Sequence, residues 1–260
     1  MAPPEPGGGD VSVTEPGKGG PRPEQLRIAS YNVHACIGTD RMYNPDRVAR
    51  VIREMEPDIV GLQEVDVGYW NAHSTAQIER LERTTGMRGI AGPTLVGQGG
   101  HYGNALLTHW PMREVRRLDL SVKGWEPRGV LDVDLDVCGT TVRIVVTHFG
   151  LNQGERRAQS GVLVRALKEI RTPLLVVLGD FNEWRLRGKI FYKLNALLGR
   201  SPTVRTWPSR IPLLALDRIW VQPKEALRNL HAHRSPLSRV ASDHLPLLTC
   251  IGLPKRGAKT

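Results

Sequence analysis

Cysteine is scarce in this chain, and its three cysteines, Cys36, Cys138 and Cys250, are odd in number and far apart. No two of them form a Cys-x-x-Cys pair, so neither a thiolate zinc site nor a dithiol redox motif is indicated. This usage fits a reducing compartment, and we expect a cytoplasmic protein.

Long apolar runs are also missing, since no stretch of about 18 uninterrupted apolar residues occurs and a membrane-spanning helix is disfavoured. Residues 1–24 contain Gly7-Gly8-Gly9 and six prolines but no apolar core of signal-peptide length. Such a segment cannot bury enough apolar surface to offset its ordering entropy, so we predict a disordered leader. Residues 25–253 are expected to form one domain, followed by a basic tail at 254–260.

Positive charge is in excess, with 36 Lys and Arg against 26 Asp and Glu and a formal net charge of +10. This balance favours a polyanionic partner, either nucleic acid or an anionic lipid surface, and charge alone does not choose between them.

Short runs rich in Val, Ile and Leu recur along the chain with turn signals between them, which is typical of strands. Strands are expected at residues 26–33, 59–65, 104–110, 130–137, 141–149, 174–178, 218–221 and 245–251. Amphipathic spacing and capping residues predict helices at residues 45–55, 75–85, 155–171 and 189–198. Because the turn at 138–140 predicts a hairpin, the pattern indicates a mixed-sheet α/β or α+β domain.

Three aspartates, Asp132, Asp134 and Asp136, alternate along one strand of this hairpin. They resemble the start of an EF-hand loop, but Val137 replaces the required glycine and no bidentate Glu follows. We therefore assign them to the solvated face of the strand.

Polar side chains stand at the ends of the expected strands. Four strands finish in amide or ionisable groups, and these are Asn32, Gln63-Glu64, His148 and the pair Asp180 and Asn182. Two other strands open on such groups, at Asp217 and at Asp243-His244. If these two run opposite to the first four, all six clusters meet at one sheet edge.

Four carboxylates would then lie close together, those of Glu64, Asp180, Asp217 and Asp243, and their charge must be balanced by a cation or by protons. Oxygen ligands without thiolates suit Mg²⁺ or Mn²⁺ better than Zn²⁺. Two histidines beside them supply the acid and base that ester hydrolysis needs. Each residue taken alone has an ordinary structural explanation, such as a strand-end acid, a turn residue or a core histidine; their joint placement favours a site.

Seven motifs carry a resemblance to a known family. In order they are Ser30-Tyr-Asn-Val-His34, Leu62-Gln-Glu-Val65, Tyr102-Gly-Asn-Ala-Leu106, Thr147-His148, Gly179-Asp-Phe-Asn182, Leu216-Asp-Arg-Ile219 and Ser242-Asp-His-Leu-Pro246. With these motifs the chain, from Leu26 to about Ile251, resembles the endonuclease/exonuclease/phosphatase superfamily, the DNase I-like metal-dependent phosphoesterases. The segment Thr206-Trp-Pro-Ser209 resembles compact bacterial members.

The resemblance implies a four-layer sandwich of two packed mixed sheets flanked by helices, with the site at one end. It implies Glu64 as the principal ligand of Mg²⁺ or Mn²⁺, with Asn32 and Asp243 completing the cage directly or through water. His244, oriented by Asp217, would activate the attacking water, a role that the family also assigns to the aspartate matching Asp180. The phosphate oxygens would be held by a last group of side chains, Asn182, His148 and Asn104.

Three functions remain open from the sequence. A nuclease is supported by the charge and by basic groups that could border the site, namely Arg156-Arg157, Arg185, Arg187, Lys189, Arg205 and Arg210. A phospholipid or phosphoinositide phosphodiesterase or phosphatase would be favoured by exposed aromatic side chains in loops, namely Tyr69, Trp70, Trp125 and Trp184. A catalytically silent binding module is the third. The motif continues as His34-Ala-Cys-Ile-Gly38 and the chain has no long insertions, which disfavours a repair endonuclease. We expect a monomer acting on a phosphate ester.

Overall fold

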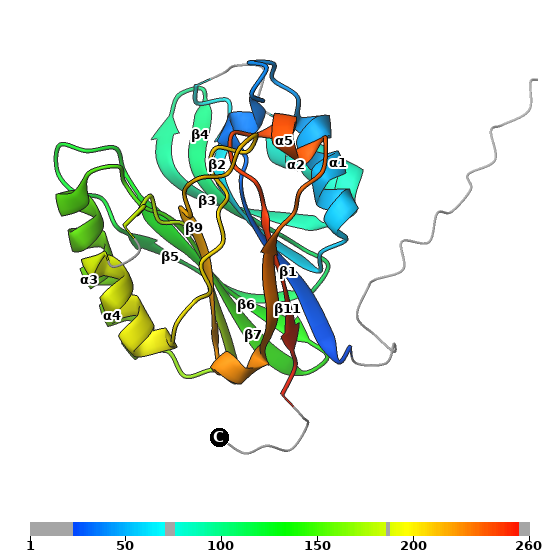
Figure 1. Ribbon diagram of the computed structural model, residues 1–260. Helices are drawn as coiled ribbons and strands as arrows, with labels where there is room; N and C mark the ends of the chain where they lie inside the picture. The colour runs from blue at the N-terminus through cyan, green and yellow to red at the C-terminus, as the bar shows by residue number, and fades with distance from the viewer. Residues whose placement is uncertain (1–22, 71–75, 186–187, 255–260) are drawn as a thin grey trace, which may run out of the picture.

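The computed structural model describes residues 23–70, 76–185 and 188–254, in which two mixed β-sheets pack face to face with helices on both outer sides (Figure 1). The expected leader, except its last two residues, and nearly all of the expected basic tail lie outside the described residues. This is the four-layer α+β sandwich that the sequence motifs imply. No helix among the described residues is long and apolar enough to cross a bilayer.

Each sheet mixes parallel and antiparallel strands. The six-stranded sheet contains, in spatial order, β10 (Leu227–Ala232), β11 (Leu247–Gly252), β1 (Gln25–Asn32), β2 (Ile59–Val67), β4 (Gly100–Thr108) and β3 (Arg88–Gly97). The five-stranded sheet contains β5 (Met112–Asp119), β6 (Gly129–Val137), β7 (Thr140–His148), β8 (Leu174–Asp180) and β9 (Asp217–Gln222). Within them β1 is parallel to β2 and β7 is parallel to β8, whereas β11 and β9 run antiparallel to their neighbours.

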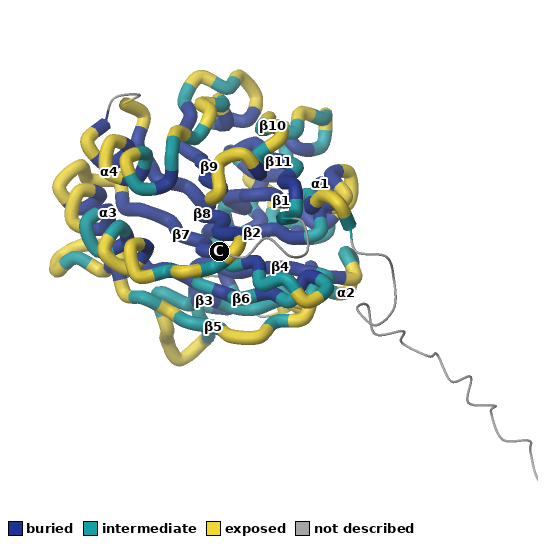
Figure 2. Tube along the Cα trace, turned by 90° about the horizontal axis from the view of Figure 1, so that it is seen from below, coloured by how far each residue is buried: buried dark blue, intermediate teal, exposed yellow. Residues whose placement is uncertain are grey.

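Apolar side chains fill three layers. The layer between the sheets joins residues such as Ile28, Leu131, Ile144 and Leu178, all fully buried. The outer face of the six-stranded sheet is covered by α1 (Pro45–Met55), α2 (Gln77–Thr85) and the short α5 (Ser238–Ala241), and that of the five-stranded sheet by α3 (Gln153–Lys168) and α4 (Lys189–Leu198). Figure 2 shows the buried strands in the centre and the exposed positions along the helices and loops.

Local sequence signals explain where the helices begin and end. Asn44 caps α1 by accepting a hydrogen bond from the Arg47 N–H at 2.9 Å, as its position before Pro45 predicts. Asn152 and Glu155 form a capping box, so α3 begins at Gln153 and not at 155 as expected. Gly86 ends α2 in the left-handed conformation. The expected start of this helix, at residue 75, lies outside the described residues.

Three strands of the described residues, β3, β5 and β10, were not predicted from the sequence. All three lie at sheet edges, where one side of the strand has no neighbour and polar side chains are tolerated. Their sequences carry charged residues, glycine and Pro93 in place of an apolar run, so hydrophobic patterning could not find them.

The alternating aspartates of β6 differ from their expected solvated role. Asp132 and Asp134 are mostly buried and pair with arginines of the neighbouring strands, Asp132 with Arg143 at 2.5 Å and Asp134 with Arg116 at 2.7 Å. Asp136 pairs with Arg113 at 2.6 Å. The face is a ladder of cross-strand ion pairs, because β5 and β7 each place arginines opposite the acids.

Gly179 is a position where we expect substitution to be severe. Its φ of +148° disfavours side chains, and a Cβ atom there would lie 1.8 Å from the Thr147 carbonyl oxygen of the adjacent strand. Gly179→Ala should therefore lower the free energy of unfolding by about 3 kcal/mol or more. Gly161→Ala, inside α3 with its nearest neighbour at 3.7 Å, should raise it by roughly 0.5–1 kcal/mol. Urea unfolding of both variants and of the unchanged protein measures the two changes in the free energy of unfolding. Equal free energies of unfolding for the two variants would contradict the prediction.

Candidate active site

The polar strand ends predicted from the sequence come together, but they belong to two sheets. Asn32 and Glu64 lie on β1 and β2 of one sheet, whereas His148 and Asp180 end β7 and β8 of the other. The expectation of one sheet edge is therefore wrong in this detail. The two sheets approach closely beneath the site, because Gly61 has no side chain where Leu178 packs against it.

Asn32 links the two sheets through side-chain hydrogen bonds. It is fully buried, and its Nδ2 donates to Glu64 Oε1 at 2.8 Å and to Asp180 Oδ2 at 3.1 Å. Its Oδ1 accepts from the backbone N–H of His34 at 3.0 Å, which fixes the orientation of the amide. The nitrogen of Asn32 thus faces the two carboxylates and holds them in place.

Glu64 owes its position to an irregularity in β2. The register with β4 shifts between Leu62 and Val65, and Glu64 adopts a positive φ of 57°. Such a conformation is uncommon for a residue other than glycine and accumulates at functional sites. The shift turns the Glu64 carboxylate toward Asn32, with about a fifth of the side chain exposed.

His244 and Asp217 form a buried pair. His244 Nδ1 lies 2.9 Å from Asp217 Oδ2, and its Nε2 lies 3.6 Å from Asp180 Oδ2. Thr206 donates its hydroxyl to the same Asp217 oxygen, and Asp217 stands opposite Asp180 in the β8–β9 ladder. The imidazole is therefore oriented by one carboxylate and directed toward another.

The pKa values of Asp180 and His244 are both raised. Burial raises the pKa of Asp180 to about 7, although the charge of His244 opposes the rise. Burial alone would lower the pKa of His244, but Asp217 and Asp180 outweigh it and raise this pKa to about 10. A carboxyl group that titrates near neutral pH beside a histidine can take up or release a proton during a reaction.

His148 and Asn182 form the opposite wall. His148 Nε2 lies 3.0 Å from Asn182 Nδ2, 3.7 Å from Asp180 Oδ2 and 3.9 Å from Glu64 Oε1. Asn182 has a positive φ of 50°, and its Nδ2 also donates to the Phe149 carbonyl at 2.8 Å. Burial first, and then the cations Arg128 and His244, hold the pKa of His148 well below its usual value, so this imidazole is neutral.

Two predicted residues lie further from this centre. Asp243 accepts from Trp207 Nε1 at 3.1 Å, and its other oxygen lies 3.6 Å from His34 Nδ1. Asn104 is buried and donates to the Gly129 carbonyl at 3.0 Å, whereas its Oδ1 has no hydrogen-bond partner. Their assignments, Asp243 to the metal cage and Asn104 to phosphate binding, stay predictions.

The donor set suits a hard divalent cation. Ligand atoms of Glu64, His148 and Asp180 lie within 4.8 Å of one another, and so do those of Asp180, Asp217 and His244. Burial first, and to a smaller extent the charge of Asp217, raises the pKa of Asp180, so a cation or a proton is favoured between these carboxylates. An Asp217 oxygen is also buried without a partner. The residues present therefore fit a metal ion held mainly by oxygen ligands.

Arg128 is a site residue that the sequence analysis missed. It is buried just before β6, pairs with Glu126 at 2.6 Å, and keeps its Nε without a partner. Its charge reaches His148 and Tyr102, and Tyr102 in turn lies near Glu64. The available signal was a charged residue opening a strand whose antiparallel neighbour ends at His148.

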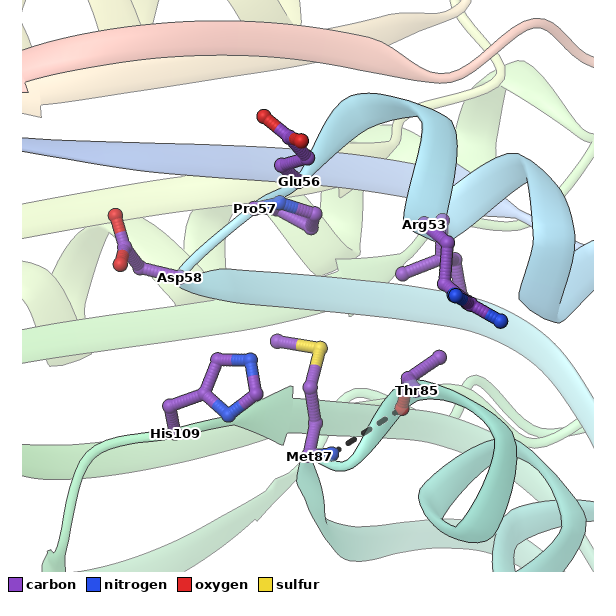
Figure 3. A pocket seen from close by; sticks show the side chains of 8 residues that line it. Arg53, Glu56, Pro57, Asp58, Thr85, Met87 and His109 are labelled. Atoms are coloured by element: carbon purple, nitrogen blue, oxygen red, sulfur yellow. Dashed lines mark hydrogen bonds between the residues drawn. The ribbon is translucent and has the colours of Figure 1, made fainter. Parts of the chain in front are cut away.

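A separate hollow of about 390 Å³ lies at the other end of the six-stranded sheet, where β2 begins (Figure 3). Arg53, Glu56, Asp58 and His109 line it from segments that flank the beginning of β2 and the end of β4. None of the predicted catalytic residues faces it.

In metal-free protein, the pKa values of the two buried histidines should be shifted in opposite directions from the usual value. In EDTA, His244 should stay protonated at pH 8 while His148 stays neutral at pH 6, because their pKa values are shifted up and down respectively. Asp217→Asn removes a negative charge that favours the imidazolium, so the pKa of His244 should fall. NMR of the imidazole resonances measures both values. Titration of both histidines near their usual value of about 6.5 would contradict the contacts of His244 with Asp217 and Asp180 and the burial of His148.

The family model for the Endonuclease/Exonuclease/phosphatase family matches residues 29–244 of the chain. The chain is 32% identical over 243 residues to YbhP, an uncharacterized protein of Escherichia coli (strain K12), and the match covers 85% of this chain and 94% of YbhP.

Solved structures share the fold. The endonuclease/exonuclease/phosphatase from Bacteroides vulgatus superposes with a TM-score of 0.73 and 22% identity, covering 88% of this chain and 99% of that one. The human Nocturnin catalytic domain with bound sulfate superposes with a TM-score of 0.70 and 22% identity, covering 89% and 95%.

Proposed function

Because the chain belongs to the endonuclease/exonuclease/phosphatase family, a family of phosphoesterase hydrolases, we propose that it cleaves phosphate esters with Mg²⁺ or Mn²⁺ at the site around Glu64 and His244. The observation that carries the proposal is the buried chain Asp217, His244 and Asp180, with Glu64 joined to Asp180 through Asn32. It combines acid and base groups with clustered carboxylates, which metal-assisted ester hydrolysis requires.

Side chains on two opposite walls of the site have different proposed roles. On one wall, Asp217 fixes the Nδ1 side of His244 and leaves Nε2 directed into the site to exchange a proton with water. Asp180, whose pKa is near 7, stands 3.6 Å from Nε2 and can share that proton. Because the pKa of His244 is raised to about 10, its imidazole carries a proton near neutral pH in the metal-free protein, so His244 can act as the base only after passing that proton to Asp180. Asp180, whose pKa is near 7, can act as the base directly. On the other wall, His148 and Asn182 place nitrogen atoms where phosphate oxygens can accept hydrogen bonds.

A bound Mg²⁺ or Mn²⁺ would polarise the phosphoryl group and neutralise its charge. Glu64 is the first residue we propose to hold it, with Asp180 and His148 within reach of the same position. Asn32 as placed orients these carboxylates, so its proposed contribution to the cage is through water.

Because the chain has a formal net charge of +10, nucleic acid is one of the substrate classes that we propose. Most of the basic residues expected to border the site are exposed, including Arg157, Arg185 and Arg205. Arg156 differs from that expectation, because it is buried and pairs with Glu183, so it cannot contact a nucleic-acid backbone. Arg187 lies outside the described residues. We also propose a cytoplasmic location, as expected from the number and spacing of the three cysteines.

A substrate panel tests the proposal. The full chain is incubated with Mg²⁺ or Mn²⁺ and with bis-p-nitrophenyl phosphate, p-nitrophenyl phosphate, plasmid DNA, RNA or anionic lipid vesicles. We expect hydrolysis of at least one substrate, and EDTA should abolish it. Absence of turnover on the whole panel would favour the silent binding module, and turnover unaffected by EDTA would contradict the metal requirement.

A further inference from the structure

Large apolar side chains are exposed around the entrance of the site. Six loops at this end of the molecule carry them, and we call one residue from each loop the apolar rim: Met42, Trp70, Trp125, Leu151, Trp184 and Ile211; the loop before β9 also exposes Leu213. The loops follow β1, β2, β7 and β8 or precede β6 and β9, so they surround the strand ends that carry the catalytic groups (Figure 1). All six side chains are at least 49% exposed.

Buried contacts hold part of the apolar rim in place. The guanidinium of Arg156, a residue only 1% exposed, lies 4.8 Å from the ring centroid of Trp184 and also donates to the Leu151 carbonyl. Trp70 packs edge-on against Tyr69 at 4.8 Å and Tyr102 at 6.4 Å. Neighbouring groups therefore hold Trp184 and Trp70 in place while 49% and 66% of these residues stay exposed.

Basic residues lie close in sequence to residues of the apolar rim. Four exposed basic residues stand within two positions of rim residues: Arg41, Lys123, Arg185 and Arg210. The acidic neighbours Asp40 and Glu126 are paired with Arg47 and Arg128. The entrance of the site therefore combines apolar contact surface with positive charge, in a chain whose net charge is +10.

This combination matches a membrane surface better than nucleic acid. Bases stack on aromatic rings, but Met42, Leu151 and Ile211 are aliphatic and offer no stacking face. Tryptophan and aliphatic side chains enter the headgroup region of a bilayer, while Lys and Arg attract anionic lipids. We propose that the site end of the protein docks on an anionic phospholipid surface through the apolar rim, and that its substrate is the phosphate ester of a membrane lipid. This inference rests on the proposed phosphoesterase function.

The test separates docking from catalysis. The full chain and the triple variant Trp125→Ser/Leu151→Ser/Ile211→Ser are sedimented with phosphatidylcholine vesicles that contain or lack phosphatidylglycerol. The three positions are 50%, 69% and 70% exposed, so the variant should fold. We expect binding to the anionic vesicles, weakened about tenfold or more in the triple variant. Hydrolysis of bis-p-nitrophenyl phosphate should be unchanged, whereas headgroup release from the vesicles should fall with binding.

Two matched single substitutions, each of which removes one lysine charge, provide the control. Lys123→Gln should weaken binding to anionic vesicles, whereas Lys224→Gln, at the opposite end of the molecule after β9, should not. Hydrolysis of the soluble diester without vesicle binding would overturn the docking proposal and leave the phosphoesterase intact. Vesicle binding without hydrolysis of any substrate would contradict the phosphoesterase function and support docking. DNA cleavage that is lost in the triple variant would overturn the lipid assignment in favour of nucleic acid.

Discussion

Replacement of His244 by asparagine is expected to lower kcat by about 10³-fold on whichever phosphate ester the protein hydrolyses. Asparagine can donate its Nδ2 to Asp217 in place of the imidazole Nδ1, so the buried carboxylate keeps a partner. It has no titrating nitrogen facing Asp180, where His244 Nε2 lies 3.6 Å away. The loss of rate would then report proton transfer and not the loss of a structural contact.

Two controls make this result decisive. His231→Ala changes an exposed histidine of β10 and should leave kcat within about twofold, since surface substitutions away from special contacts have small effects. Thermal unfolding of His244→Asn should stay close to that of the unchanged protein. A His244→Asn protein that is folded and retains full activity would exclude His244 as the base and leave Asp180 in that role.

The residues of the candidate site were more predictable from the sequence than the edge strands of the fold. The strands β1, β2, β7 and β8 each carry an apolar run that finishes in polar residues, and polar residues stand at or just before the start of the runs in β9 and β11. These runs therefore indicated both the strand and the position of its candidate site residue. The meeting of Glu64 with Asp180 followed from the expected strand directions, whereas the pairing of Asp217 with His244 was implied by the family resemblance. The strands β3, β5 and β10 lie at sheet edges and have no apolar run, whereas β9, which is also an edge strand, keeps Ile219, Trp220 and Val221 buried and was found.

Arg156 and Arg128 were misjudged from the sequence for a different reason. Arg156 was taken for a surface cation, yet Glu183 and the carbonyls of the loop after β7 bury it. Arg128 was overlooked, although it stands beside His148. Both depend on loop conformation and on contacts between distant segments, which hydrophobic periodicity does not record.

Replacement of Glu64 by glutamine is expected to weaken divalent-metal binding by at least about a hundredfold, because loss of even an outer-shell partner costs 10–100-fold. Glutamine keeps an oxygen that can accept the Asn32 hydrogen bond, so the geometry of Asn32 and Asp180 is preserved. Only the negative charge at the Glu64 position is lost. Activity at fixed Mg²⁺ should fall about 10³-fold and recover partly as the metal concentration rises.

Calorimetric titration of Mn²⁺ into the metal-free protein measures the affinity, and Glu79→Gln on α2 is the matched control for loss of one exposed acid. The same titration tests the electrostatic argument. Because the cation relieves repulsion among Glu64, Asp180 and Asp217, its binding should raise the melting temperature of the unchanged protein more than that of Glu64→Gln. Equal affinity and equal thermal shift in the two proteins would place the metal away from Glu64. The chain Asp217, His244 and Asp180 would then have to act without a cation held by the neighbouring sheet.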